Sequence, residues 1–483
     1  MALPVSNAVP PDPALVALNR FGLGARPDDD LGKIAADARG FLKAELKQQD
    51  IALVSIEDPA NAGLLDSTAA IQASMAANAE RKAERDRMAQ PTAEPTAMAA
   101  VSPDAKAKST VPKVEADICR DEAQARFDKA LNAGPGFVER LVGFWSNHFC
   151  VSVAKGQIVR ACAGAFEREA IRPFVLGRFA DMLLAVEHHP AMLFYLDNQQ
   201  SIGPDSRAGK RRGRGLNENL AREILELHTL GVDGGYSQAD VTSFAGVLTG
   251  WTMAGREGRL GEPGSFVFNT NAHQPGEAVL LGKTYPAGGM GQGEAALNDI
   301  ARHPATARHI AGKLARHFIA DDPPPQSVAH LAAVFTKTDG DLRALALALV
   351  DMPEAWSMPL AKLRAPFDYV MALRRAVGPS AGKEPQRTLG WLRALGEPLW
   401  QPPGPNGFPD HSDAWASAEG LKTRLDIAWQ TAQQADDIGN PGDMLSTLIG
   451  ASASAETREA IARAESRRQG LALLLMAPEF QRR

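Results

Sequence analysis

The segment Asn217–Gly231, with the sequence NENLAREILELHTLG, holds the densest group of residues that could do chemistry. Four of its polar residues recur at the spacing of one helix face: Asn219, Arg222, Glu223 and Glu226. The two glutamates could together bind a cation or share a proton, with Arg222 holding one carboxylate in place. The alternative is an amphipathic helix facing solvent, in which Glu218 and Arg222 form an ion pair one turn apart.

A metal site on these two glutamates would need histidines from elsewhere in the chain. Helical bundles bind divalent metals through carboxylates and histidines on facing helices, so a divalent metal is the cofactor that this interpretation predicts. The candidate ligands are Glu223, Glu226, His148, His189 and His273. Each histidine taken alone is better explained as a hydrogen-bonded part of the fold, and both interpretations stay open.

Two further segments place polar residues among apolar ones. FWSNHF (Phe144–Phe149) holds Asn147 and His148 amid aromatic residues, and a buried amide or imidazole needs hydrogen-bond partners. HHPAMLFYLDN (His188–Asn198) ends with an aspartate that suits either a turn or a carboxylate aimed at a site. The candidate catalytic residues are therefore Glu223, Glu226, Arg222, His148, Asp197 and Asn219.

Two groups of cations are candidate anion sites. On the helix predicted over 304–319 they are Arg308, His309, Lys313, Arg316 and His317, which more simply form a charged outer face. The Gly-rich loop 203–215 contains Lys210–Arg214 but lacks the strand–turn–helix context that aims backbone N–H groups at phosphate. No nucleophile elbow, HExxH, Walker A, GxGxxG or CxxC sequence occurs, which disfavours common hydrolases and nucleotide enzymes.

Composition narrows the class of protein. Of the 483 residues, 45% are hydrophobic and 23% charged, as in ordinary globular proteins. The formal charge of −5 and the 6% of aromatic residues disfavour nucleic-acid partners. The three cysteines have no zinc-ligand spacing. We expect no signal peptide and no membrane span, hence a cytoplasmic protein, or a periplasmic or exported one if a leader has been removed.

The elements that must position these residues are mainly helices. Helical periodicity recurs along most of the chain without βαβ alternation, which predicts an all-α fold of many helices. A β-hairpin is expected near residues 265–285, from the fragments FVF and AVLLGKTY. We expect an N-terminal helical segment over 1–83, a disordered Ala/Pro/Thr-rich loop over 84–117 and a main helical domain over 118–483.

Taken together, ordered segments along the chain resemble an uncharacterised bacterial family, domain of unknown function 1800. They are LNRFGLGARP (18–27), FWSNHFCVS (144–152), GRFADMLLAVEHHPAMLFYLDN (177–198), NENLAREILELHTLGVDGGYSQADV (217–241), LTGW (248–251), RHPATARHIAGKLARHF (302–318), QPPGPNGF (401–408) and PEFQRR (478–483). Ser146 stands where the family usually has a second histidine, and Phe408 where it usually has tryptophan. The resemblance implies a sulfatase-like partner protein and often an export signal, but no established reaction.

Two functional hypotheses follow. The first is an enzyme with a polar cavity between helices, lined by the candidate catalytic residues and containing a divalent metal in one version. The second is a non-catalytic accessory or scaffold protein that acts with a sulfatase-like partner, since structural networks produce the same residue pattern. The two differ in whether Asn147, His148, Asp197, Arg222 and Glu223 meet around one cavity.

Overall fold

The computed structural model describes residues 11–89, 111–212, 215–378, 385–435 and 438–483. Across these residues the protein is predominantly α-helical, as predicted, with two small antiparallel sheets. One hydrophobic core runs from Ala14 to Phe480, so the N-terminal helices and the rest of the body share the same core. Among the described helices none is long and apolar enough to cross a membrane.

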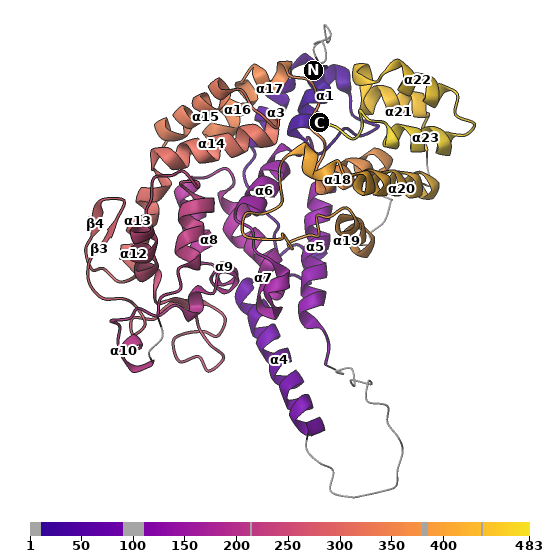
Figure 1. Cartoon of the computed structure of the whole chain (residues 1–483). Helices are drawn as coiled ribbons and strands as arrows, with labels where there is room; N and C mark the ends of the chain where they lie inside the picture. Colours follow the sequence, from indigo (N-terminus) through magenta and orange to yellow (C-terminus); the bar gives the residue numbers. More distant parts are fainter. Residues whose placement is uncertain (1–10, 90–110, 213–214, 379–384, 436–437) are drawn as a thin grey trace, which may run out of the picture.

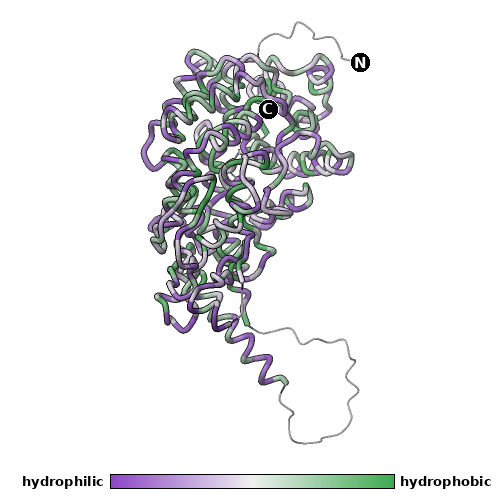
Figure 2. Tube along the Cα trace, turned by 60° about the vertical axis from the view of Figure 1, so that its left-hand side comes forward, coloured by the Kyte–Doolittle hydropathy of each residue, from purple (hydrophilic) through white to green (hydrophobic). Residues whose placement is uncertain are grey.

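Helices α5, α6 and α7 lie in the centre of the body, α8, α10 and α12 lie on the side of α13, and α4 and one end of α5 project from the body (Figure 1). Polar residues cover the projecting end of α4 (Figure 2). The helix bounds are α1 Pro13–Leu15, α2 Leu31–Ala36, α3 Ala38–Leu46, α4 Ser67–Ala89, α5 Val114–Asn132, α6 Phe137–His148, α7 Gln157–Phe166, α8 Phe179–His188, α9 Pro190–Tyr195, α10 Gly209–Arg212, α11 Asn219–Glu223 and α12 Gln238–Leu248. Three π-helical segments extend them: Val16–Phe21, Glu167–Ile171 and Ile224–His228.

The second half packs around this centre, with α13 to α17 on one side and α18 to α23 on the other (Figure 1). Helices α14 and α15 pack against each other, as do α20 and α23. The bounds are α13 Met290–Ala301, α14 Pro304–Phe318, α15 Pro325–Lys337, α16 Leu342–Asp351, α17 Glu354–Ser357, α18 Pro366–Val377, α19 Pro385–Ala394, α20 Ala418–Gln434, α21 Pro441–Leu448, α22 Ala455–Ala462 and α23 Arg467–Met476. Short 3-10 turns lie at 59–61, 153–155, 172–174, 198–200, 412–415 and 450–452.

Local sequence signals explain where many helices begin. Helices α9, α14, α18 and α21 start with proline, whose fixed φ suits the first helical position. At α12, Ser237 and Asp240 form the predicted capping box, in which each side chain accepts from the other residue's backbone N–H. These caps satisfy N–H groups that have no partner inside the helix.

The strands pair differently from the predicted hairpin. β2 (Phe266–Phe268) pairs with β1 (Trp251–Met253), and β3 (Ala278–Leu280) pairs with β4 (Lys283–Tyr285). The positive φ of Leu281 and Gly282 forms the tight turn between β3 and β4, so AVLLGKTY is a hairpin by itself. FVF is held instead against a strand that the sequence analysis did not identify.

The predicted disordered loop, 84–117, lies mostly outside the described residues. Its two ends are helical, because α4 continues to Ala89 and α5 begins at Val114. The buried Glu115 of α5 forms an ion pair with Arg81 of α4 and accepts a hydrogen bond from Ser74. This contact between two polar helices is tertiary, so the local composition gave no sign of it.

Candidate functional site

A cavity of about 220 Å³ lies between α6, α14, the start of α18 and the segment Asn406–His411. Segments more than two hundred residues apart in the sequence contribute to its wall. The polar and charged side chains that line it are Arg126, Glu139, Arg140, Asn147, His148, Lys313, Arg316, His317, Asp368, Glu397, Asn406, Asp410 and His411. The cavity wall therefore combines many charged and polar groups with apolar side chains such as Leu23, Phe144 and Phe367.

Asn147, near the end of α6, fastens one side of the cavity. Its Nδ2 donates to the carbonyl oxygen of Phe408 at 2.9 Å, and its Oδ1 accepts from the Phe408 N–H at 2.8 Å. The neighbouring Gly407 has φ of 77°, and a Cβ there would lie 2.4 Å from the Asn147 carbonyl oxygen. The close approach of this segment to α6 thus requires glycine.

His148 and Lys313 meet in the cavity wall. The Nζ of Lys313 lies 2.9 Å from Nδ1 of His148, whose Nε2 lies 3.0 Å from the carbonyl oxygen of His228. Since a carbonyl only accepts, Nε2 carries the proton and Nδ1 accepts from the lysine. Burial, and then the charge of Lys313, hold the pKa of His148 well below its ordinary value, so this imidazole is neutral.

Lys313 differs from most cations of this protein in its lowered pKa and in its polar partner, which is a histidine. Burial lowers the pKa of its ammonium to about 8. In the described part of the chain, the side-chain contact of Lys313 is with His148 and that of Arg316 is with the Asp321 carbonyl oxygen, 3.3 Å away. Neither cation has a carboxylate partner among those residues.

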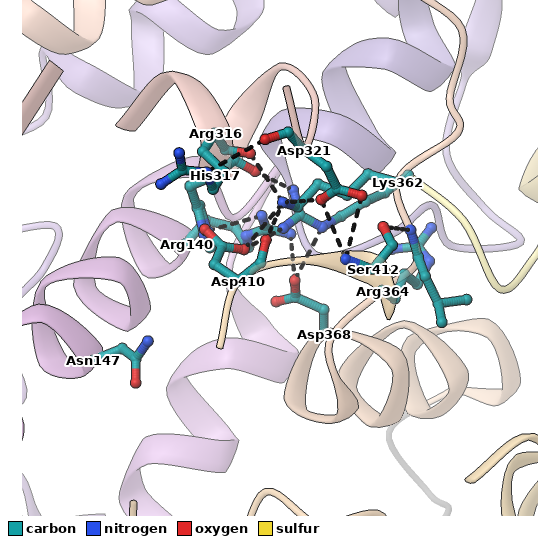
Figure 3. A network of polar contacts seen from close by, with 12 residues as sticks. Arg140, Asn147, Arg316, His317, Asp321, Lys362, Arg364, Asp368, Asp410 and Ser412 are labelled. Atoms are coloured by element: carbon teal, nitrogen blue, oxygen red, sulfur yellow. Dashed lines mark hydrogen bonds and ion pairs between the residues drawn. The ribbon is translucent and has the colours of Figure 1, made fainter. Parts of the chain in front are cut away.

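A network of ion pairs lies beside Arg316 (Figure 3). Arg140 of α6 contacts Asp368 of α18 at 2.8 Å, and its Nη2 lies 3.0 Å from Nε2 of His317. Arginine only donates, so Nε2 of His317 accepts and Nδ1 donates to Asp410 at 2.9 Å. Lys362 also pairs with Asp410 at 3.3 Å. The network joins α6, α14, α18 and the segment around Asp410.

Burial and neighbouring charges shift the pKa values of His317, Asp410 and Glu397 by different amounts and in different directions. Burial lowers the pKa of His317 to about 4. Burial opposes ionisation of Asp410, but His317, Lys362 and Arg483 outweigh it and hold the pKa of that carboxyl well below its usual range. Burial raises the pKa of Glu397 to about 7, against a hydrogen bond from the Phe367 N–H. At neutral pH, Asp410 is therefore charged while much of Glu397 is protonated.

A family model described as "Protein of unknown function (DUF1800)" matches residues 16–482. The chain belongs to this family. No curated protein and no solved structure matches the chain. Because the DUF1800 description names no activity, the function has to be argued from the geometry of the site.

In this DUF1800 protein, only one of the candidate catalytic residues, His148, lines the cavity. Arg222 donates to Glu218 at 3.1 Å and to Gln238 at 2.8 Å, which is the surface ion pair of the alternative interpretation. Asn219 is exposed. Glu226 accepts from the Tyr236 hydroxyl at 3.4 Å.

The remaining two candidates also lie outside the cavity. Glu223 is partly buried, and burial raises the pKa of its carboxyl. Asp197 pairs with Lys155. The helix predicted over 217–230 is α-helical to Glu223 and π-helical from Ile224 to His228. A π-helix closes its hydrogen bonds one residue later than an α-helix, so the α-helical spacing from which the face was predicted does not hold beyond Glu223.

The predicted metal ligands do not gather in one place. His189 pairs with Glu169 at 3.2 Å, and His273 Nδ1 lies 2.9 Å from the Thr249 carbonyl oxygen. Over the residues that the structure describes, no three or more His, Cys, Asp and Glu side chains are placed to hold a metal ion. Ser146, at the position of the missing family histidine, donates to Glu167 at 2.8 Å.

The sequence analysis assigned the cations of α14 mainly to an outer face, and the structure divides them. Arg308 is exposed, whereas Lys313, Arg316 and His317 line the cavity. A signal was available, because Lys313 and His317 each follow a buried residue, Ile310 and Leu314, by three positions on one helix. For Arg140, Asp368, Glu397 and Asp410 no local pattern indicated a site.

The variant Gly407→Ala tests the close packing of the segment 406–411 against Asn147 of α6. The positive φ and the clash with the Asn147 carbonyl should lower the free energy of unfolding by about 1–3 kcal/mol. Urea unfolding measures the change. Gly404→Ala is the control, because its added Cβ would meet only the Asn406 side chain, which can rotate. Equal stability of the two variants would contradict the described packing.

The His317 pair predicts a dependence of stability on pH. The folded-state pKa of about 4 lies below the ordinary 6.5, so the unfolded chain binds more protons between these values. The contribution of neutral His317 to stability is therefore present above pH 6.5 and is lost as the pH falls towards 4. Urea unfolding of the wild type and His317→Gln should show their difference in unfolding free energy shrinking over that range. A difference independent of pH would contradict a buried neutral His317.

Proposed function

We propose that this protein is an enzyme that binds a small anionic molecule in the cavity and uses the Lys313 amine for proton transfer. The observation that carries the proposal is the position of this amine. It lies in the cavity wall, 2.9 Å from a neutral imidazole and without a carboxylate partner among the described residues. Partly buried ammonium groups without a counterion are costly, so such a group fits a bound anion better than a structural role.

The charges around the cavity favour an anionic ligand. Three of its carboxylates already have cationic partners: Glu139 pairs with Arg172, Asp368 with Arg140, and Asp410 with Lys362. The fourth carboxyl, Glu397, has a pKa of about 7 and so carries only part of a charge near neutral pH. The uncompensated charge is thus positive and belongs to Lys313 and Arg316, three residues apart on α14.

The Lys313 amine is suited to proton transfer. A group transfers protons best when its pKa lies near the working pH, and a pKa of about 8 leaves both forms populated near neutral pH. His148 would act as a positioning residue, because its Nδ1 holds the amine while its Nε2 is bound to the His228 carbonyl oxygen. The volume of about 220 Å³ is below that of pockets for drug-sized ligands, which favours a small substrate.

Anion binding tests the first half of the proposal. We expect calorimetric titration with phosphate, sulfate, oxalate, pyruvate and lactate to find at least one ligand. Lys313→Met should weaken its binding roughly tenfold or more, since one charge-assisted hydrogen bond contributes about 1.5–3 kcal/mol. The matched control is Lys337→Met, an exposed lysine on α15. Lys313→Met should leave thermal stability unchanged or higher, because it removes an unpaired charge. If no anion binds and the variant is less stable, Lys313 is structural and the accessory hypothesis replaces this one.

Proton transfer is tested separately. In D₂O, the wild type should exchange C–H protons of a bound 2-oxo acid such as pyruvate, as followed by NMR, whereas Lys313→Met should not. Lys337→Met again controls for the loss of a lysine. Exchange at the same rate in Lys313→Met, or none with any bound organic anion, would contradict a catalytic Lys313.

Lys313 also predicts a change in stability at alkaline pH. Its folded-state pKa of about 8 lies below the ordinary 10.5, so the unfolded chain binds more protons between these values. The free energy of unfolding of the wild type, relative to Lys313→Met, should therefore rise as the pH increases from about 8 to 10.5. Chemical denaturation across that range measures it. A falling or flat difference would show that the amine is not held in a desolvated site.

A further inference from the structure

A second and larger cavity, of about 990 Å³, opens beside α10 and shares no lining residue with the first. Its walls come from residues 199–211, from the connection between β1 and β2, and from residues 269–272. Four arginines line it: Arg207, Arg211, Arg256 and Arg259. Arg207 and Arg211 belong to the Gly-rich loop 203–215, and the other two arginines come from a segment about fifty residues later in the sequence.

Backbone hydrogen bonds fix these walls. The Ala208 N–H donates to the Asn271 carbonyl oxygen at 2.8 Å, and the Gly203 N–H donates to the Ala272 carbonyl oxygen at 2.9 Å. On the other side, Ala254 donates to Ser265 at 2.8 Å and so closes the β1–β2 connection. The arginines therefore project from backbone that is held in place, and their joint presence in the cavity lining is a property of the fold.

Most of the charged side chains that line this cavity are cationic. Arg259 pairs with Glu257 at 2.6 Å, and Glu257 is the one carboxylate among the lining residues. No carboxylate partner is recorded within the described residues for Arg207, Arg211 or Arg256. Guanidinium groups bind carboxylate, sulfate and phosphate through paired N–H donors. In a chain of net charge −5, such a concentration of cations in a hollow focuses the field on anions.

The other lining residues narrow the ligand class. Gln199, Gln200, Asn269 and Asn271 bring amide groups into the same cavity, and none of the described residues that line it is aromatic. Amides both donate and accept hydrogen bonds, as sugar hydroxyl groups do. Single-stranded nucleic acid would require aromatic groups for base stacking. The volume is larger than one inorganic anion requires.

From these observations, we propose that the cavity beside α10 binds an acidic oligosaccharide, with the arginines on its carboxylate or sulfate groups and the amides on its hydroxyls. The site is independent of the cavity at Lys313.

Calorimetric titration of the full chain with hexagalacturonate and with a heparin-derived hexasaccharide tests this proposal. The first ligand carries carboxylates and the second sulfates, so the titrations also identify the preferred anionic group. We expect at least one to bind, maltohexaose not to bind, and affinity to fall as salt is added. The double variant Arg207→Gln/Arg256→Gln should weaken binding by roughly tenfold or more, through the loss of two charge-assisted contacts.

The matched control is Arg308→Gln/Lys337→Gln, which removes two exposed cations from α14 and α15 outside the cavity. It should bind as the wild type does, and all three proteins should unfold at the same temperature because the replaced groups are exposed. The proposal is overturned if neither acidic hexasaccharide binds or if the Arg207/Arg256 variant retains full affinity. It is also overturned if hexaglutamate or hexathymidylate binds as tightly, since the cavity would then respond to charge alone.

Discussion

Asp410 is held as an anion inside the protein, and its partners come from distant parts of the chain. His317 contacts it from α14, and Lys362 from the segment before α18. Arg140 of α6 contacts His317 in turn. Asp410 is partly buried, whereas the pair of Arg140 and Asp368 beside it is buried. A buried charge that loses its partner costs about 3–5 kcal/mol, so these segments can separate only at a large energetic cost. The relative position of α6, α14 and α18 depends on this requirement.

The same network determines which groups remain free. Asp410 and Asp368 are paired with Lys362 and Arg140 and form no ion pair with Lys313, so the attraction of Asp410 offsets only part of the effect of burial on this ammonium. Burial then lowers the pKa of that ammonium, and His148 orients it without contributing charge. The lowered pKa of Lys313 thus follows from its burial without an ion-pair partner among the described residues. By contrast, the arginines of the cavity beside α10 are exposed, and their positions depend on backbone hydrogen bonds.

The helix that carried the strongest sequence signal has a different structural role. Its apolar residues Leu220 and Ile224 enter the core, and its last residue, His228, supports His148 through a backbone carbonyl. The polar face was inferred from α-helical geometry, but the helix becomes π-helical at Ile224. Arg222, which precedes the π-helical part, meets Glu218 and Gln238 at the surface. The segment contributes to the cavity through its backbone, which side-chain patterns do not report.

Sequence alone determined what depends on neighbours along the chain. Helical periodicity, the proline starts and the Ser237–Asp240 capping box predicted the all-α fold because these signals act within a few residues. The family also followed from ordered local segments. His148, which lines the cavity, was chosen as a candidate because a histidine among aromatic residues is locally unusual. Tertiary structure alone decided that Lys313 would face a cavity and that Asp410 would meet His317, because burial and ion pairing join residues whose separation in sequence carries no record of their contact.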